Sequence, residues 1–249
     1  MKNIWIGYDP RVPLQYNVLA HSICTTASRP IAVTPLIIEQ CDQVVKDVRK
    51  VDMTTITATE VQYEQGKGTI GFNRMGLTCF TYTRFMIPFL NNYEGWSLFM
   101  DSDMLVQDDI HKLLAMADDR YTVMVVKNKI RFEWASLMLF NNAKCQKLTP
   151  EFVSTSNDLH RIKWCPEEEI GELPPEWNHL ENVDEPKEKV SLIHYTQGVP
   201  YWEKTANTPN AASWHQEAGF ACSMPEWEDL MGNSVHHKDG VLKKGADYA

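Results

Sequence analysis

Short apolar runs that end in polar or glycine-containing segments recur along the chain, and each predicts a buried β-strand. The runs cover residues 3–8, 31–38, 97–100, 121–126, 136–140 and 190–194. Pro35 lies inside the second run and argues against a central place in a sheet, because proline cannot donate a hydrogen bond to a neighbouring strand.

Segments with helical spacing of apolar residues lie between these runs. We expect helices over residues 14–27, 79–90, 109–114 and 150–160. Pro88 kinks the second helix or marks its end, and Asp108 or Asp109 lies where negative charge favours the start of the third. Strands that alternate with helices predict an α/β fold with a mostly parallel sheet, covered by helices on both faces.

Composition narrows the classes of protein that fit this pattern. The chain has 249 residues, of which 43% are apolar and 23% charged, as in ordinary globular domains. A net charge of -9 and a pI near 5.4 argue against a nucleic-acid-binding surface. We expect one domain over residues 1–204 and a C-terminal appendage over 205–249, where the polar sequence loses its periodicity.

The N-terminus and the cysteines indicate a cellular compartment. The first apolar run reaches Gly7 too early for a signal peptide, and no run approaches the roughly 18 apolar residues of a membrane helix. Six cysteines are spread along the chain without a Cys-x-x-Cys pair, as expected of reduced, mostly buried thiols. These features predict a cytoplasmic protein.

The strongest chemical signal is Asp101-Ser102-Asp103, directly after the apolar run 96–100. Two carboxylates so close together resist joint ionisation unless a cation binds them. Hard oxygen ligands suit Mg²⁺ or Mn²⁺, and a partly open cation of this kind can grip a diphosphate. The alternative is that Asp101 begins a turn and Asp103 is solvated.

Three further features map to the edge where a site is expected, because ligands bind beyond the carboxyl ends of the strands in an open parallel sheet; two follow predicted strands, and Trp134-Ala135-Ser136 precedes the one that ends at Phe140. They are Tyr8-Asp9, Trp134-Ala135-Ser136 and the segment from His194 to Gly198. His194 follows the last predicted strand, and a neutral imidazole is a competent third metal ligand. The alternative is a core histidine that the backbone satisfies.

Arg84 and the acidic run 167–169 can each be interpreted in two ways. Arg84 lies among aromatic residues, where its guanidinium either pairs with a carboxylate or grips a phosphate or sugar hydroxyl. The run Glu167-Glu168-Glu169 is either a solvated loop or a source of one carboxylate that faces the pocket.

Four motifs, in order, resemble those of the retaining glycosyltransferase family 8 of GT-A fold, the group of glycogenin and the bacterial galactosyltransferases. They are Tyr82-Thr83-Arg84-Phe85, Asp101-Ser102-Asp103, Leu173-Pro174-Pro175-Glu176-Trp177-Asn178 and Ile193-His194-Tyr195. The resemblance spans about residues 3–204.

The resemblance implies a nucleotide-sugar donor, a UDP-hexose, with Mn²⁺ or Mg²⁺ held between Asp101, Asp103, His194 and the diphosphate. Asp9 would contact the base, with Tyr8 beside it, and Arg84 would contact the donor's phosphate or sugar. The other donor-binding candidates are Ser102, Trp134, Gln197, Gly198 and Lys204.

The sequence departs from the family pattern at three places. Gly198 comes one residue late, and Pro200 stands where the family has a phosphate-binding lysine, for which Lys204 can compensate. Trp134-Ala135-Ser136 replaces an Asn-x-Gly segment. The Asp-Gln pair near the anomeric carbon has no clear match, so Glu169 is the nearest catalytic candidate, beside Arg84.

We therefore expect a metal-dependent glycosyltransferase that transfers a hexose to an acceptor hydroxyl with retention of anomeric configuration. One alternative is a nucleotidyltransferase, although the early glycine-rich phosphate loop typical of that class is missing. Another is a non-catalytic sugar-nucleotide or carbohydrate-binding protein. The acceptor, whether carbohydrate, lipid-linked or protein, is not specified by the sequence.

Overall fold

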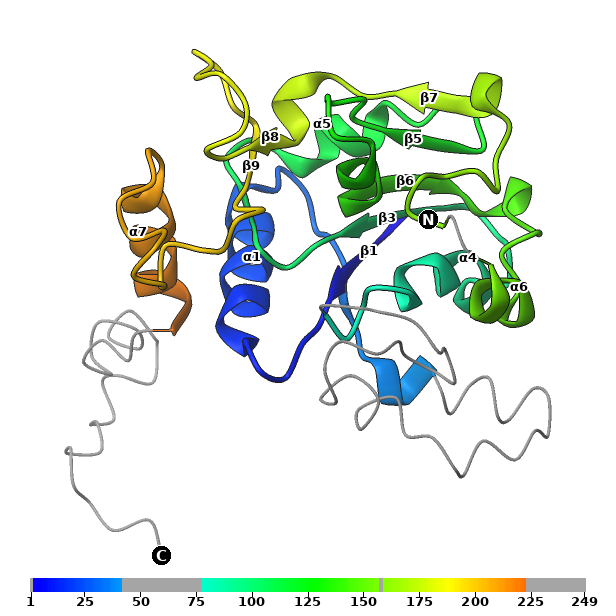
Figure 1. The fold of residues 1–249 in the computed structure, drawn as a ribbon, viewed down its shortest axis with the longest axis horizontal. Helices are drawn as coiled ribbons and strands as arrows, with labels where there is room; N and C mark the ends of the chain where they lie inside the picture. Colours follow the sequence, from blue (N-terminus) through cyan, green and yellow to red (C-terminus); the bar gives the residue numbers. More distant parts are fainter. Residues whose placement is uncertain (1, 42–77, 157–158, 223–249) are drawn as a thin grey trace, which may run out of the picture.

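A six-stranded sheet forms the centre of the molecule in the computed structural model, which describes residues 2–41, 78–156 and 159–222 (Figure 1). The strand order is β2-β1-β3-β6-β5-β7. Their bounds are β1 Lys2–Gly7, β2 Val33–Leu36, β3 Trp96–Met100, β5 Val123–Val125, β6 Leu137–Asn141 and β7 Ile170–Glu172. The apolar runs predicted five of these strands but not β7, and β2, which contains Pro35, ends one side of the sheet.

One strand of this sheet breaks the parallel pattern. β1 runs parallel to β2 and β3, and β5 runs parallel to β7, whereas β6 is antiparallel to both of its neighbours, β3 and β5. Because β6 is reversed, its first residue, Leu137, lies opposite Met100 at the end of β3. The residues that enter β6 therefore lie at the same edge of the sheet as those that leave β3.

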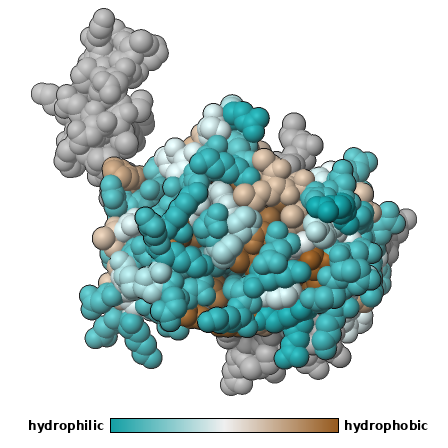
Figure 2. All heavy atoms as spheres, turned by 90° about the horizontal axis from the view of Figure 1, so that it is seen from above, coloured by the Kyte–Doolittle hydropathy of each residue, from teal (hydrophilic) through white to brown (hydrophobic). Residues whose placement is uncertain are grey.

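Hydrophobic residues cover both faces of the sheet. Alternate side chains of β3 point to opposite faces, so that Phe99 joins one core cluster with Phe85 while Leu98 joins another with Leu19. The first face packs against α4 (Ile87–Leu90) and α6 (Pro150–Thr155), and the second against α1 (Pro13–Thr26) and α5 (Ile110–Ala115). The outer surface is mainly hydrophilic in the view from above (Figure 2).

A second, smaller sheet has the order β4-β9-β8, with β4 at Met104–Val106, β8 at His179–Leu180 and β9 at Leu192–His194. β4 begins directly after Asp103 and pairs antiparallel with β9. The run 190–194 was expected to be the last strand of the main sheet, and it belongs instead to this small one. β4 lies against α1, where the Ser22 hydroxyl accepts a hydrogen bond from the Val106 N–H at 3.2 Å.

Two predicted helices are shorter than their sequence patterns. Residues 79–90 form turns, the 3₁₀ helix η1 (Thr83–Met86) and then α4, in which Pro88 is one of the first helical residues. α6 ends at Thr155, and residues 157–158 of the predicted helix lie outside the described part. The third expected helix is α5, whose N-cap Asp109 accepts a hydrogen bond from the His111 N–H.

The helix α7 (Ala211–Cys222) lies beside α1 (Figure 1). Its Trp214 is buried, and the buried Glu181 carboxylate accepts hydrogen bonds from Asn210 N, Asn210 Nδ2 and Thr208 Oγ1. Residues 223–249 of the expected appendage lie outside the described part, and the boundary at 204 stays a prediction. Among the described helices, none has the length and apolarity needed to cross a bilayer.

Candidate metal and donor site

Asp101 follows β3 and is held by the backbone and by the buried guanidinium of Arg84. Its N–H donates to the Ser136 carbonyl oxygen at 2.9 Å, and its Oδ1 lies 2.9 Å from Nη1 of Arg84. The same Nη1 donates to the Ala135 carbonyl at 2.8 Å. Of the two roles that the sequence left open for Arg84, the structure thus shows pairing with a carboxylate.

Aromatic rings fix the Arg84 guanidinium. The guanidinium carbon lies 4.8 Å from the centre of the Phe99 ring and 5.4 Å from that of Phe80, within the range of cation–π attraction. Gly7 lets the Phe80 ring come this close, since a Cβ at Gly7 would lie 2.3 Å from a ring carbon. The buried Arg84 therefore has a rigid position from which to hold Asp101.

Asp103 and His194 are brought together by the small sheet. Met104 and His194 are paired residues of β4 and β9, and the Tyr195 N–H donates to the Asp103 carbonyl oxygen at 2.9 Å. Nε2 of His194 then lies 3.4 Å from Oδ1 of Asp103. The histidine is the last residue of β9, and β9 is aligned by its pairing with β4, which directly follows Asp103.

The three residues can offer ligand atoms that all lie within 4.8 Å of one another. Oδ1 of Asp101 faces the Arg84 guanidinium as an ion pair without a hydrogen bond, and Oδ1 of Asp103 is buried and accepts none, so each has lone pairs available. Burial raises the pKa of Asp101, an effect that Arg84 only partly offsets. Burial alone would lower the pKa of His194, but the carboxylates around it, above all Asp103, raise it. A divalent cation would relieve this crowding of charge.

Ser102 joins the aspartate loop to the first helix. It is buried, and its hydroxyl donates to Oε1 of Gln15, near the start of α1, at 3.2 Å. This hydrogen bond therefore fixes the middle of the aspartate loop to α1.

Two residues beside His194 were not found by sequence reasoning. Oδ1 of Asn178 lies 3.1 Å from Nδ1 of His194, and Oε2 of Glu133 lies 3.9 Å from the same nitrogen. Asn178 ends the Leu-Pro-x-x-Trp-Asn segment, so the motif was visible but its role was not. Glu133 stands in the 3₁₀ helix η2 (Arg131–Ser136), where no sequence signal marked it.

At the exit of β1, Asp9 is fully engaged within the chain. Its two oxygens accept hydrogen bonds from Arg11 N, Nε and Nη2 and from the Cys79 N–H, which fill the roughly four lone-pair sites of a carboxylate. Burial would raise the pKa of Asp9, but these contacts, led by Arg11, lower it. Tyr8 is half-buried, with its ring edge-to-face to Tyr16.

The other donor-binding candidates are at or beyond the same edge. The Trp134 ring is buried in the core, and its Nε1 donates to the Asn128 carbonyl at 2.9 Å. Gly198 turns the chain after β9 with a φ of 112°, a conformation that side chains rarely adopt. Gln197 and Lys204 are exposed beyond it.

Glu169 lies at the opposite edge of the sheet. It precedes β7, its carbonyl accepts the Thr122 N–H, and its carboxylate accepts the Thr122 hydroxyl hydrogen. β5 and β7 are parallel and both start there, beside the end of β6. The structure therefore does not bring Glu169 to Asp101, because the acid run enters a strand rather than leaving one.

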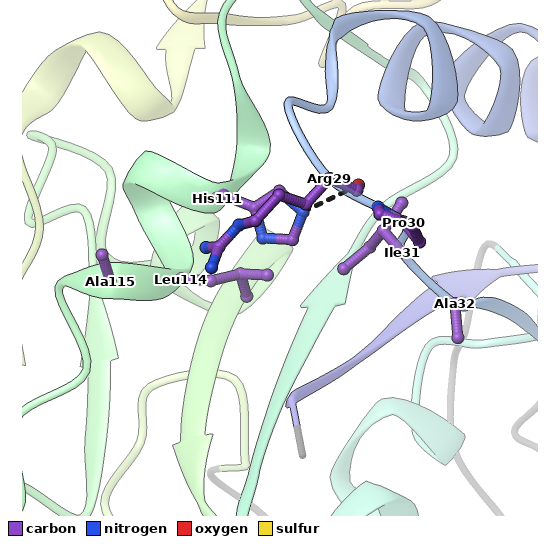
Figure 3. Close-up of a pocket in the computed structure, with 7 residues that line it drawn as sticks. All are labelled: Arg29, Pro30, Ile31, Ala32, His111, Leu114 and Ala115. Carbon is purple, nitrogen blue, oxygen red and sulfur yellow. Dashed lines mark hydrogen bonds between the residues drawn. The ribbon is translucent and has the colours of Figure 1, made fainter.

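A cavity of about 440 Å³ lies at that far edge as well, between the segment before β2 and α5 (Figure 3). Its lining includes Arg29 and His111, and Nε2 of His111 bonds to the Arg29 carbonyl. It shares no residue with the Asp101 cluster, so it is not part of the candidate site.

Comparison with known proteins identifies the group to which these features belong. The sequence profile described as "Glycosyl transferase family 8" matches residues 14–164. Protein CDI of Arabidopsis thaliana is 32% identical over 240 residues, which cover 86% of this chain and 85% of that protein.

Solved structures show the same fold at low identity. The galactosyltransferase LgtC, in complex with donor and acceptor sugar analogues, has a TM-score of 0.58 at 14% identity, covering 92% of this chain and 99% of that one. GlyE of Streptococcus pneumoniae TIGR4 also has a TM-score of 0.58, at 15% identity, covering 99% of this chain and 67% of that one. The expected GT-A fold is confirmed.

Proposed function

The chain belongs to glycosyl transferase family 8, and we propose that it transfers a hexose from a UDP-hexose to an acceptor hydroxyl, with the help of a divalent metal and with retention of configuration. Membership in this family identifies the protein as a glycosyltransferase, which removes the nucleotidyltransferase and the non-catalytic binder as alternatives.

The observation that carries the metal dependence is the cluster of Asp101, Asp103 and His194. Its donor set of two carboxylates and one imidazole suits Mn²⁺, and the same oxygens suit Mg²⁺. The two Oδ1 atoms accept no hydrogen bond and supply lone pairs in a buried setting, where an acceptor without a hydrogen bond costs free energy. These residues therefore fit the cation that the family resemblance implies.

When bound, the cation would neutralise the negative charge that develops on the departing diphosphate. The residues of the chain hold the metal ligands in position. Arg84 keeps the Asp101 carboxylate in place, and β4 and β9 keep Asp103 against His194. Because these groups are fixed before the donor arrives, little free energy is lost in orienting them.

For the nucleotide we propose Tyr8 as the contact of the base, at the exit of β1. Asp9 shapes this loop rather than binding the base directly, since its oxygens are already occupied by Arg11 and Cys79. Gln197, Gly198 and Lys204 would face the diphosphate from the turn after β9, where the two exposed side chains are free to move toward it.

Calorimetric titration of UDP in the presence of Mn²⁺ tests the metal site. Loss of a residue that only hydrogen-bonds to a metal ligand typically weakens binding by about 10- to 100-fold. We expect Asp103→Asn, which changes a ligand itself, to weaken metal-dependent UDP binding by more than this. Asp119→Asn is the control, because Asp119 is exposed and bonds to Trp96 at the start of β3. Unchanged affinity in a folded Asp103→Asn protein would contradict the proposal.

The stereochemical part has its own test. NMR of the product formed with a true acceptor should show the anomeric configuration of the donor. An inverted product would refute retention and leave the metal site and the fold unaffected.

A further inference from the structure

The side of His194 that faces away from Asp103 is closed by Asn178. Both side chains are buried, with Asn178 at 0% and His194 at 1% exposure. Asn178 follows the 3₁₀ helix η5 (Pro175–Trp177) and precedes β8, and its Oδ1 lies 3.1 Å from Nδ1 of the histidine. The imidazole thus has Asp103 at Nε2 and an amide at Nδ1.

The neighbours of the amide decide which of its two ends faces the histidine. The other end lies 3.0 Å from Oγ of Ser136 and 3.4 Å from the Glu133 carbonyl oxygen. A carbonyl only accepts, and the Ser136 hydroxyl already donates to that same carbonyl at 2.6 Å. The Ser136 oxygen must therefore accept, which requires Nδ2 of Asn178 at this end and Oδ1 toward His194.

This arrangement sets the position of the proton on the imidazole. Because Oδ1 of Asn178 can only accept, Nδ1 of His194 must carry a hydrogen. In the neutral ring the lone pair is then on Nε2, the nitrogen beside Asp103. The Glu133 carboxylate, held by the Thr196 hydroxyl at 3.1 Å, lies 3.9 Å away on the Nδ1 side, and the Asp103 carboxylate lies 3.4 Å away on the Nε2 side. Because charge acts on both nitrogens, the hydrogen bond with Asn178 decides which one carries the hydrogen in the neutral ring.

We propose that Asn178 is a positioning residue that fixes the tautomer and orientation of His194, so that Nε2 presents its lone pair to the metal. This inference rests on the proposed metal role of His194. The hydrogen-bond partners of Nδ2 of Asn178 belong to η2. Carbonyl groups of η2 also accept hydrogen bonds from Arg84 and from the Asp101 N–H, so this one short segment positions both Asp101 and the partner of His194.

The chain offers a matched control in Asn142, which is also fully buried. Its Nδ2 likewise donates to a backbone carbonyl and a serine hydroxyl, those of Glu94 at 2.8 Å and Ser97 at 2.9 Å. Asn142 lies at the far edge of the sheet, and its Oδ1 accepts no hydrogen bond. The two asparagines therefore differ chiefly in the histidine.

Long-range ¹H–¹⁵N NMR of the metal-free protein, at a pH where His194 is neutral, reads the tautomer directly. We expect wild-type His194 to carry its hydrogen on Nδ1. A hydrogen on Nε2 would overturn the proposal without the need for any variant.

Mn²⁺ titration followed by electron paramagnetic resonance supplies the second readout. We expect Asn178→Leu to mix the tautomers and weaken Mn²⁺ binding by about 10- to 100-fold, as for other lost partners of metal-ligating histidines. Asn142→Leu should lower the melting temperature and leave both readouts unchanged. Asn178→Asp, which keeps the acceptor oxygen, should restore the tautomer even if Asn178→Leu does not fold.

The outcomes separate this inference from the proposed function. Wild-type Mn²⁺ affinity in Asn178→Leu, or mixed tautomers in Asn178→Asp, would overturn the role of Asn178. A wild-type protein with the expected tautomer but no Mn²⁺ binding would instead overturn the metal site on which the inference depends.

Discussion

The two sheets meet at the loop from Asp101 to Asp103, and they hold the two aspartates in different ways. Asp101 leaves a five-residue strand that is buried in the main sheet, and Arg84 and the Ser136 carbonyl fix it from neighbouring elements. Asp103 enters a small sheet whose strands have two or three residues, and only that sheet brings His194 beside it.

This difference separates residues that contribute to folding stability from residues that contribute to metal binding. The groups around Asp101 are part of the folding core, since Arg84 packs on the rings of Phe80 and Phe99. The pair formed by Asp103 and His194 is polar, and Oδ1 of Asp103 accepts no hydrogen bond. We therefore expect changes on the main-sheet side to lower stability first and changes on the small-sheet side to lower metal affinity first.

The largest effect is expected for Arg84→Leu. Removing one member of a buried ion pair strands the other charge, and such changes typically cost about 3–5 kcal/mol of unfolding free energy. Urea denaturation measures the loss. Arg120→Leu is the control, because Arg120 pairs with Asp118 on the surface, where ion pairs contribute about 0–1 kcal/mol. Equal losses in the two variants would show that the main-sheet side is not held by Arg84.

On the small-sheet side, we expect His194→Ala to lower Mn²⁺ affinity by at least about tenfold, or about 1.4 kcal/mol, while circular dichroism shows intact secondary structure. The melting temperature and the metal titration are measured on the same sample. A protein that melts earlier but binds Mn²⁺ normally would make His194 a core residue instead of a ligand.

Acid should weaken the main-sheet side through Asp9. Its pKa in the folded protein lies below the ordinary value of 3.8, so its contribution to stability is complete above that pH and disappears as the pH falls through the folded pKa. We expect the urea midpoint of the wild type to fall more steeply below pH 3.8 than that of Asp9→Asn. Parallel profiles would show that Arg11 and Cys79 do not stabilise the charged carboxylate.

The smallest effect is expected at the far edge, for Glu169→Gln. Weakening its hydrogen bond with Thr122 should cost about 1 kcal/mol of stability. Because Glu169 is far from Asp101 along the sheet, kcat and KM for the donor should not change. A large fall in kcat at unchanged stability would instead support the catalytic role that the sequence analysis predicted for Glu169.

Five strands of the main sheet could be predicted because each lies in an apolar run, whereas β7, with the sequence Ile-Gly-Glu, was missed. Asp101 was found for the same reason, since a polar residue after such a run must emerge at the edge of the sheet. Of the small sheet only β9 lies in a predicted run, and it was assigned to the main sheet; β4 and β8 are too short to be recognised from the sequence. His194 was identified as a ligand from its position after an apolar run and from the family resemblance, but its partner strand was unknown.

Glu169 and Asn178 show most clearly which features of the site could not be predicted from the sequence. The acid run of Glu169 precedes an apolar strand, and only the pairing of β5 with β7 decided that it starts at the far edge. Asn178 is one amide among many, and only the folded neighbours of its two ends give it a direction toward His194.

The sequence by itself determined the α/β class, the family and the carboxylate pair at a strand exit, because these depend on local pattern and on short motifs. Only the tertiary structure decided that β6 is reversed, that Arg84 serves Asp101, and that β4 delivers Asp103 to His194. These contacts join residues far apart in the chain, and their partners are chosen by packing and hydrogen-bond geometry, which no single stretch of sequence contains.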